Sequence, residues 1–122
     1  MDKQNVAILG ASDHPGRYSH MALVQLLEHG HRPLLVNPRL DSVDGVKCYS
    51  HLNDLEEKID TLTIYVNPHI SDSLAREILD SGAGRVIFNP GSENESLYKP
   101  LRKKGVEVIE ACTLVMLRTG QF

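Results

Sequence analysis

The residues best suited to binding chemistry follow the first apolar run of the chain. Val6–Leu9 leads directly into Gly10, and a helical pattern begins near Arg17. A buried strand, a tight turn and a helix start form an arrangement in which backbone N–H groups converge on a phosphate. The expected phosphate contacts are the amides of Ala11, Ser12 and Asp13, the Ser12 hydroxyl, the first-turn amides of the helix and the Arg17 guanidinium.

The residues that follow the first and second apolar runs limit which nucleotides the expected site could bind. The glycine that follows Gly10 is Gly16, so the G-x-G-x-x-G spacing of dinucleotide-binding proteins is absent. NAD-binding proteins hold an acidic residue after the second strand, for the ribose diol. Here that place reads Asn37-Pro38-Arg39, with no carboxylate before Asp41. A cation there suits a ribose that carries its own phosphate, as in NADP or coenzyme A.

An Asn-Pro pair follows three of the apolar runs: Asn37-Pro38, Asn67-Pro68 and Asn89-Pro90. Asparagine can bond to its own backbone, and proline ends strand pairing while holding the preceding residue extended. Each pair alone is explained by strand termination. Because all three fall at the same edge of the expected sheet, we predict that together they shape the rim of a binding site.

Five short apolar runs predict the strands that position these residues. They are Val6–Leu9, Leu34–Val36, Leu62–Val66, Arg85–Phe88 and Val106–Ile109. Their regular spacing, with helical segments between them, is typical of right-handed parallel crossovers. We predict an α/β fold: one doubly wound, Rossmann-like domain over residues 1–122, with a parallel five-stranded sheet in the order 3-2-1-4-5 and helices on both faces. Such sheets bind ligands at their carboxyl edge, beside the first strand.

Local signals set the ends of the expected helices. The helices run from about Arg17 or Ser19 to His29, from Ser71 to Gly82, from Ser92 to Gly105 and from Thr113 to Arg118. Ser71 is expected to cap the second, and Ser92 with Glu95 to form a capping box for the third, which Pro100 must kink or shorten. Residues 37–53 are expected to be irregular and to precede a single helical turn around Asp54–Glu57.

Composition and charge exclude several classes of function. The 122 residues carry a formal net charge of −3, and the one basic cluster, Arg102–Lys104, lies at the end of a predicted helix, where it complements the helix dipole, so we expect no nucleic-acid partner. No signal peptide and no apolar run long enough for a membrane span is present, which predicts a soluble cytoplasmic protein. Cys48 and Cys112 lack the spacing of a metal or redox pair, although Cys112 could lie near the mouth of the site. We expect no metal ligands and no catalytic residues.

In order and spacing, these motifs resemble the small stand-alone CoA-binding proteins, which are similar to the CoA-binding domain at the front of the succinyl-CoA synthetase alpha subunit. The motifs are Val6–Ser12 with Pro15 and Arg17, Val36–Arg39, Gly45–Tyr49 with Leu52, Ile64–Val66 with Pro68, Asn89–Glu95, and Cys112. The synthetase subunit has a second domain with a phosphorylated histidine. These residues have no counterpart of that domain, so the resemblance gives no basis for assigning ligase activity.

The resemblance implies that coenzyme A, or a short acyl-CoA, is the ligand. It implies that the pyrophosphate lies on the Gly10–Ser12 turn with Arg17 as a contact. The adenosine end would lie near Asn37-Pro38-Arg39 and Val66, and the pantetheine arm would pass Asn67-Pro68 and Asn89-Pro90-Gly91. Two alternatives stay open, namely an NADP-binding protein and a nucleotide-binding subunit of an acyl-CoA-using enzyme. A protein partner is possible under either.

Overall fold

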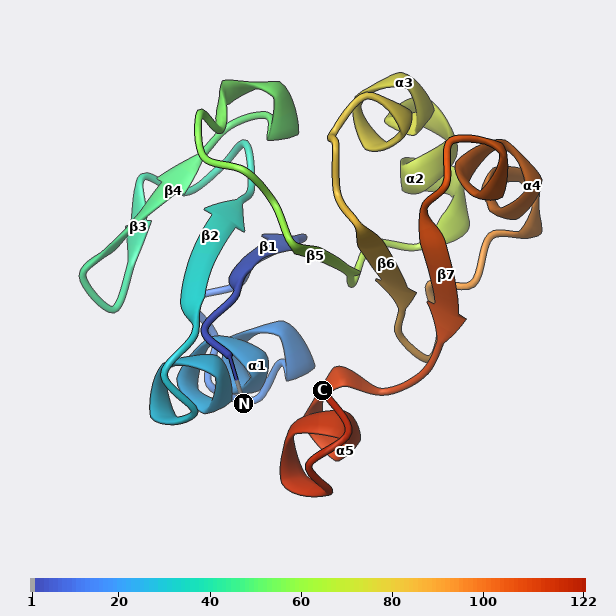
Figure 1. Cartoon of the computed structure of the whole chain (residues 1–122). Coiled ribbons are helices and arrows are strands. Elements are labelled where there is room, and N and C mark those ends of the chain that lie inside the picture. Colours follow the sequence, from blue (N-terminus) through green and yellow to red (C-terminus); the bar gives the residue numbers. More distant parts are fainter. Residues whose placement is uncertain (1) are drawn as a thin grey trace.

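A mixed sheet of seven strands runs between two layers of helices in the computed structural model, which describes residues 2–122 (Figure 1). The strands are β1 (Asn5–Leu9), β2 (Arg32–Val36), β3 (Ser42–Val43), β4 (Val46–Tyr49), β5 (Thr61–Ile64), β6 (Arg85–Phe88) and β7 (Glu107–Glu110). The helices are α1 (Tyr18–Glu28), α2 (Pro68–Ser73), α3 (Ala75–Leu79), α4 (Glu95–Lys103) and α5 (Thr113–Arg118), with one 3-10 turn, η1 (Leu52–Asp54).

The strand order is β3-β4-β2-β1-β5-β6-β7, and every neighbouring pair is parallel except the hairpin of β3 and β4. β1 lies in the middle, with Leu9 opposite Val36 of β2 on one side and Ile64 of β5 on the other. The predicted Rossmann-like α/β architecture is therefore confirmed. The five-stranded, all-parallel sheet is wrong, because residues 37–53 contain two strands where an irregular segment was expected.

The predicted order 3-2-1-4-5 is wrong for the same reason. The third predicted strand, β5, pairs with β1 and does not lie beyond β2. The place beyond β2 is taken by β4, where Cys48 is opposite Leu35. Consequently β2, β1 and β5 are neighbours, and the loops that follow them meet at one edge of the sheet.

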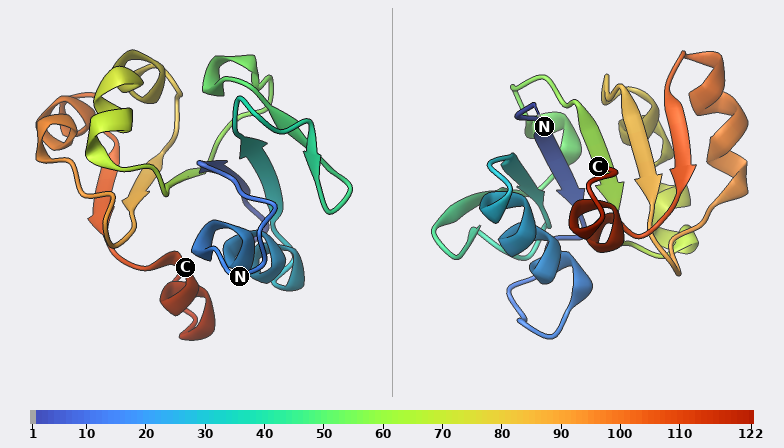
Figure 2. Two further views of the ribbon diagram at one scale, coloured as in Figure 1. Left: turned by 180° about the vertical axis from the view of Figure 1, so that it is seen from behind. Right: turned by 60° about the horizontal axis from the view of Figure 1, so that its bottom comes forward.

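The helices form two layers, with α1 and α5 on one face of the sheet and α2, α3 and α4 on the other (Figures 1 and 2). Side chains of β1 alternate between the two layers, as the pleat of a strand requires. Val6 and Ile8 pack with the layer of α1 and α5, whereas Ala7 and Leu9 pack with the opposite layer. All four side chains are buried, which explains why Val6–Leu9 is a continuous apolar run in the sequence.

The first and last helices agree with prediction within a residue or two, but other helix starts were placed wrongly. Asn67, not Ser71, caps α2: its Oδ1 accepts a hydrogen bond from the Ile70 amide at 2.9 Å, and Ser71 is buried inside the helix. Asn94, not Ser92, caps α4. Asparagine suits both places because its short amide reaches the free amides of the first turn.

Two smaller predictions concern α4 and the turn after β4. Pro100 lies inside α4, which continues to Lys103 and is shorter than the predicted helix from Ser92 to Gly105. The expected turn at Asp54–Glu57 lies slightly earlier, as η1.

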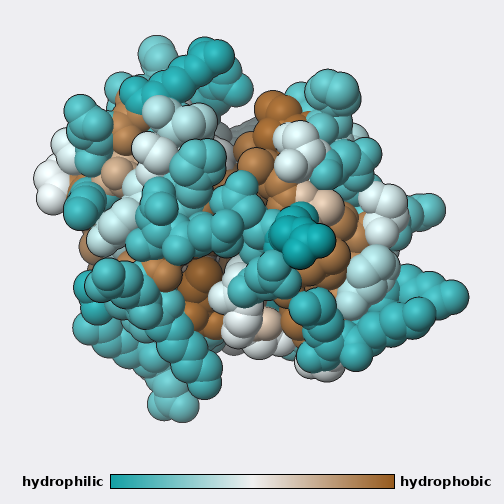
Figure 3. Space-filling view, turned by 90° about the horizontal axis from the view of Figure 1, so that it is seen from above, coloured by the Kyte–Doolittle hydropathy of each residue, from teal (hydrophilic) through white to brown (hydrophobic). Residues whose placement is uncertain are grey.

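Hydrophilic residues cover most of the surface seen from above, and hydrophobic residues show in the gaps between them (Figure 3). None of the helices within residues 2–122 is long and apolar enough to cross a membrane.

Candidate functional site

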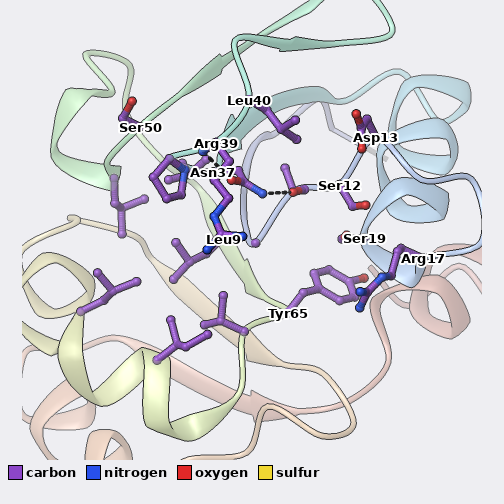
Figure 4. Close-up of a pocket in the computed structure, with 18 of the residues that line it drawn as sticks. Leu9, Ser12, Asp13, Arg17, Ser19, Asn37, Arg39, Leu40, Ser50 and Tyr65 are labelled. Atoms are coloured by element: carbon purple, nitrogen blue, oxygen red, sulfur yellow. Dashed lines mark hydrogen bonds between the residues drawn. The ribbon is translucent and has the colours of Figure 1, made fainter.

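A cleft of about 810 Å³ lies at the carboxyl edge of the sheet, where β2, β1 and β5 end (Figure 4). Its volume is within the range of pockets that hold small molecules and cofactors. One wall is the Gly10 turn with the start of α1, and the facing wall is the loop after β2. The end of β5, helices α2 and α3, and the residues after β4 complete it.

Gly10 is required by the close approach of the first turn to the end of β5. Its φ is +93°, in the region that favours glycine, and a Cβ there would lie 2.9 Å from Cγ1 of Val66. The amides of Gly10 and Ala11 both donate to the carbonyl of Val36 at 3.1 Å. The Ala11 amide, one of the expected phosphate contacts, therefore already has an acceptor, which joins the turn to β2.

The next two amides of the turn are available. No residue in 2–122 accepts a hydrogen bond from the Ser12 or Asp13 amide. The Ser12 Oγ accepts from the His14 amide at 3.1 Å and keeps its own proton to donate. The turn thus presents two amides and one hydroxyl to the cleft.

The start of α1 adds further donors. The amides of His20 and Met21 donate to the carbonyl of Arg17, whereas those of Tyr18 and Ser19 precede the helical ladder and have no intrahelical acceptor. Both residues line the cleft. The positive end of the helix dipole therefore faces the same space as the amides of the turn.

Two arginines flank these donors from opposite walls. Arg17 lies beside the start of α1, and Arg39 lies in the loop after β2 (Figure 4). Both are exposed, and neither forms an ion pair with a carboxylate of residues 2–122. The cleft therefore has two uncommitted positive charges beside a set of free amides, which is the donor set that a phosphorylated ligand requires.

Asn37 holds the loop that carries Arg39. Its Nδ2 donates to the carbonyl of Ala11 at 2.7 Å, and its Oδ1 accepts from the Arg39 amide at 2.8 Å. Asn37 therefore fixes the separation of the two walls and has little hydrogen-bonding capacity left for a ligand.

Tyr65 forms part of the floor of the cleft, with its side chain directed toward Arg17 (Figure 4). Its hydroxyl oxygen is buried and forms no hydrogen bond of good geometry with residues 2–122, although the hydroxyls of Thr63 and Thr113 lie close enough to lower its pKa somewhat. Burial raises the pKa of Tyr65 to about 12, so the phenol is neutral at physiological pH.

The end of the cleft formed by η1, α2 and α3, across from Arg17, is apolar (Figure 4). Leu52, Ile70 and Leu74 line it, together with Glu77 of α3. Glu77 Oε1 accepts a hydrogen bond from the Leu52 amide at 3.1 Å. Glu77 Oε2 lies 3.7 Å from Nδ1 of His51.

Comparison with known families decides what kind of domain this is. Residues 4–118 match the sequence model of the CoA binding domain. The chain belongs to that family. The resemblance drawn from the sequence motifs is therefore confirmed at the level of the CoA-binding domain.

Relatives of this CoA-binding domain include small proteins and parts of large enzymes. The uncharacterized protein YneT of Bacillus subtilis is 32% identical over 106 residues, which cover 87% of this chain and 78% of YneT. The ADP-forming acetate–CoA ligase of Methanocaldococcus jannaschii is 29% identical over 97 residues, which cover 79% of this chain but 14% of the ligase. A crystal structure of an uncharacterized protein matches over the full length of both chains, with 38% identity and a TM-score of 0.94.

Most of the site residues expected from the sequence line the cleft of this CoA-binding domain. They are Gly10, Ala11, Ser12, Arg17, Asn37, Pro38, Arg39, Val66 and Pro90. Asn67, Pro68, Asn89 and Gly91 are not among the lining residues. Neither is Cys112, which directly precedes α5.

Asn89 has a different place from the expected rim. It is 3% exposed, and its side chain donates to the Thr63 hydroxyl at 2.7 Å and the Ile64 carbonyl at 2.9 Å. Its Oδ1 accepts from the Thr113 amide at 2.9 Å. Asn89 therefore joins β5, β6 and the start of α5 below the cleft.

Sequence reasoning missed the residues that line the cleft after β4 and on α2 and α3, and also Tyr65. They include Ser50, His51, Leu52, Ile70, Leu74 and Glu77. Tyr65 was predicted to lie inside the strand Leu62–Val66, whereas β5 ends at Ile64 and leaves Tyr65 at the carboxyl edge. The others depend on β4, which was not predicted.

Proposed function

We propose that this protein binds coenzyme A, or a short acyl-CoA, in the cleft at the carboxyl edge of the sheet. The observation that carries the proposal is the free amides of Ser12 and Asp13 lying between Arg17 and Arg39, neither of which is neutralised by a carboxylate of residues 2–122. The family of the chain supports the same ligand.

The pyrophosphate binds the Gly10–Ser12 turn. Its oxygens accept hydrogen bonds from the Ser12 and Asp13 amides, from the Ser12 hydroxyl and from the first turn of α1. Arg17 contributes a charge-assisted contact, and such a hydrogen bond stabilises a complex by about 1.5–3 kcal/mol.

Arg39 distinguishes coenzyme A from nucleotides without a phosphate on the ribose. It occupies the place after β2 where NAD-binding proteins carry an acid. The adenosine lies between the loop of Pro38 and Val66, and the pantetheine arm leaves the cleft past Pro90. Both of these loops line the cleft.

Calorimetric titration with CoA, dephospho-CoA, NADP and NAD tests the proposal. CoA is expected to bind most tightly. Arg17→Ala is expected to weaken CoA binding by about 10- to 150-fold, the loss of one charge-assisted hydrogen bond. Arg39→Ala is expected to reduce the preference for CoA over dephospho-CoA. Arg118→Ala, an exposed cation on α5 outside the cleft, is the control for charge alone and should change neither quantity.

The outcomes separate the candidate ligands. Binding of NADP without binding of CoA would replace the proposal with an NADP-binding function. Unchanged CoA affinity in Arg17→Ala would remove Arg17 from the site.

A second candidate, a nucleotide-binding subunit of an acyl-CoA-using enzyme, rests on the likeness to a segment of an ADP-forming acetate–CoA ligase. It predicts acyl-CoA turnover that appears only when a co-purifying partner is added.

A further inference from the structure

The apolar end of the cleft is closed by a carboxylate that is held in a fixed position. The Glu77 side chain is 18% exposed, and the hydrogen bond from the Leu52 amide orients it. Asp13, the other acidic residue that lines the cleft, is more exposed and lies in a loop. Its side chain is 56% exposed, and its neighbour in that loop is His14.

The surroundings of Glu77 suit a flat, uncharged ring. Leu52, Ile70 and Leu74 contribute apolar surface to this end of the cleft, while Arg17 and Ser12 lie on the opposite side (Figure 4). A carboxylate repels phosphate groups, and the repulsion is stronger in a cleft than in open water. Glu77 therefore favours the orientation in which the phosphates of a nucleotide face Arg17 and its base faces α3.

The carboxylate retains acceptor capacity. An ionised carboxylate has about four lone-pair positions and no proton to donate. One position of Oε1 is taken by the Leu52 amide, and Oε2 lies near Nδ1 of His51. Residues 2–122 make no other hydrogen bond to this carboxylate, so its remaining positions can accept from a donor on a ligand.

We propose that Glu77 makes the cleft selective for adenine by accepting a hydrogen bond from the exocyclic amino group of the base. The inference rests on the proposed function, and it assigns base selectivity to a residue of α3. Adenine carries a donor at this position, whereas hypoxanthine and guanine carry an acceptor oxygen there. An acceptor oxygen facing the Glu77 carboxylate leaves two lone-pair groups opposed and no hydrogen bond between them.

The test compares CoA with its hypoxanthine analogue, in which oxygen replaces the exocyclic amino group, by calorimetric titration. The unaltered protein is expected to bind CoA at least about tenfold more tightly, as the loss of a hydrogen bond to a charged group implies. Glu77→Gln keeps the shape of the side chain. Its carbonyl oxygen can still accept from the Leu52 amide, which leaves the amide N–H₂ to donate to the analogue. The preference for CoA is therefore expected to fall to about one or to reverse.

Glu56→Gln is the matched control. Glu56 is exposed and does not line the cleft, so this substitution removes the same charge and is expected to keep the preference of the unaltered protein. The measured quantity is the ratio of the affinities for CoA and for its hypoxanthine analogue. Loss of a negative charge strengthens the binding of both anionic ligands alike, so it does not change this ratio. A preference that falls in Glu77→Gln but not in Glu56→Gln supports the inference.

The failures are distinguishable. If CoA and the hypoxanthine analogue bind the unaltered protein equally, the inference is overturned and the proposed function stands. A preference that persists in folded Glu77→Gln overturns the inference in the same way. If CoA does not bind at all, the proposed function is wrong, and the inference falls with it. The comparison on the unaltered protein decides the matter even where Glu77→Gln does not fold.

Discussion

Substituting Gly10 by alanine tests whether the close contact between the first turn and the end of β5 determines stability. The residue has a φ of +93°, and an added Cβ would lie 2.9 Å from Cγ1 of Val66 and 3.4 Å from its amide nitrogen. The backbone conformation alone costs a residue with a Cβ about 1–2 kcal/mol. The contact adds about 1–3 kcal/mol, because valine has few rotamers and the neighbouring backbone cannot move away freely.

We therefore expect Gly10→Ala to lower the free energy of unfolding by about 2–5 kcal/mol, measured by urea denaturation with far-ultraviolet circular dichroism. At about 4 °C per kcal/mol for a domain of this size, the melting temperature falls by about 10 °C or more. Gly30→Ala is the matched control. Gly30 also has a positive φ, +81°, but nothing lies within 4 Å of its Cβ position, so only the backbone cost applies.

A double-mutant cycle with Val66→Ala isolates the steric part. With Cγ1 removed, Gly10→Ala is expected to cost about as much as Gly30→Ala, which gives a coupling of about 1–3 kcal/mol between the two sites. Equal costs for Gly10→Ala and Gly30→Ala in the unaltered background, or no coupling to Val66, would refute the reasoning.

Three further predictions concern groups beneath and beside the cleft. Asn89→Ala should lower the free energy of unfolding by about 3 kcal/mol, because it leaves the buried Thr113 amide without its acceptor. Asn67→Ala removes only an exposed helix cap and should lower it by about 1 kcal/mol. Equal losses of stability in urea denaturation would contradict the role given to Asn89. Tyr65→Phe should change the melting temperature little, because the buried hydroxyl that it removes forms no hydrogen bond of good geometry and only approaches the hydroxyls of Thr63 and Thr113. A clear drop would mean that one of these approaches is a stabilising hydrogen bond. Since the pKa of Tyr65 is raised to about 12, the unfolded chain loses this proton before the folded one does, so stability should fall as the pH rises from about 10 to 12, and less steeply in Tyr65→Phe.

The part of the fold that was predictable from sequence is the part with local signals. The apolar run, Gly10 and the helical pattern after Arg17 lie next to one another in the chain, and the structure has β1, the turn and α1 at these places. The strand β4 has no comparable signal. Its four residues follow the burial pattern of half-buried, exposed, buried, half-buried, and it is held by pairing Cys48 with Leu35, far away in the sequence. Missing it displaced β5 in the predicted order and concealed the apolar end of the cleft.

The three Asn-Pro pairs show a second limit. They look alike in the sequence, but Asn37 joins two walls of the cleft, Asn67 caps a helix, and Asn89 is buried in a network with Thr63 and Thr113. The partners of Asn89 lie 26 and 24 residues away in the chain. Contacts between residues far apart in the sequence therefore determine which asparagine can face a ligand, and the local sequence pattern does not predict those contacts.

The two outermost strands bear on how the molecule behaves at high concentration. β3 has only two residues, and β7, at the opposite border of the sheet, begins and ends with an exposed glutamate, Glu107 and Glu110. Short strands and charged side chains are poor templates for backbone pairing between molecules. Copies of this protein are therefore protected against polymerising through strand addition, although the centre of the sheet is a continuous array of apolar, pairing-competent strands.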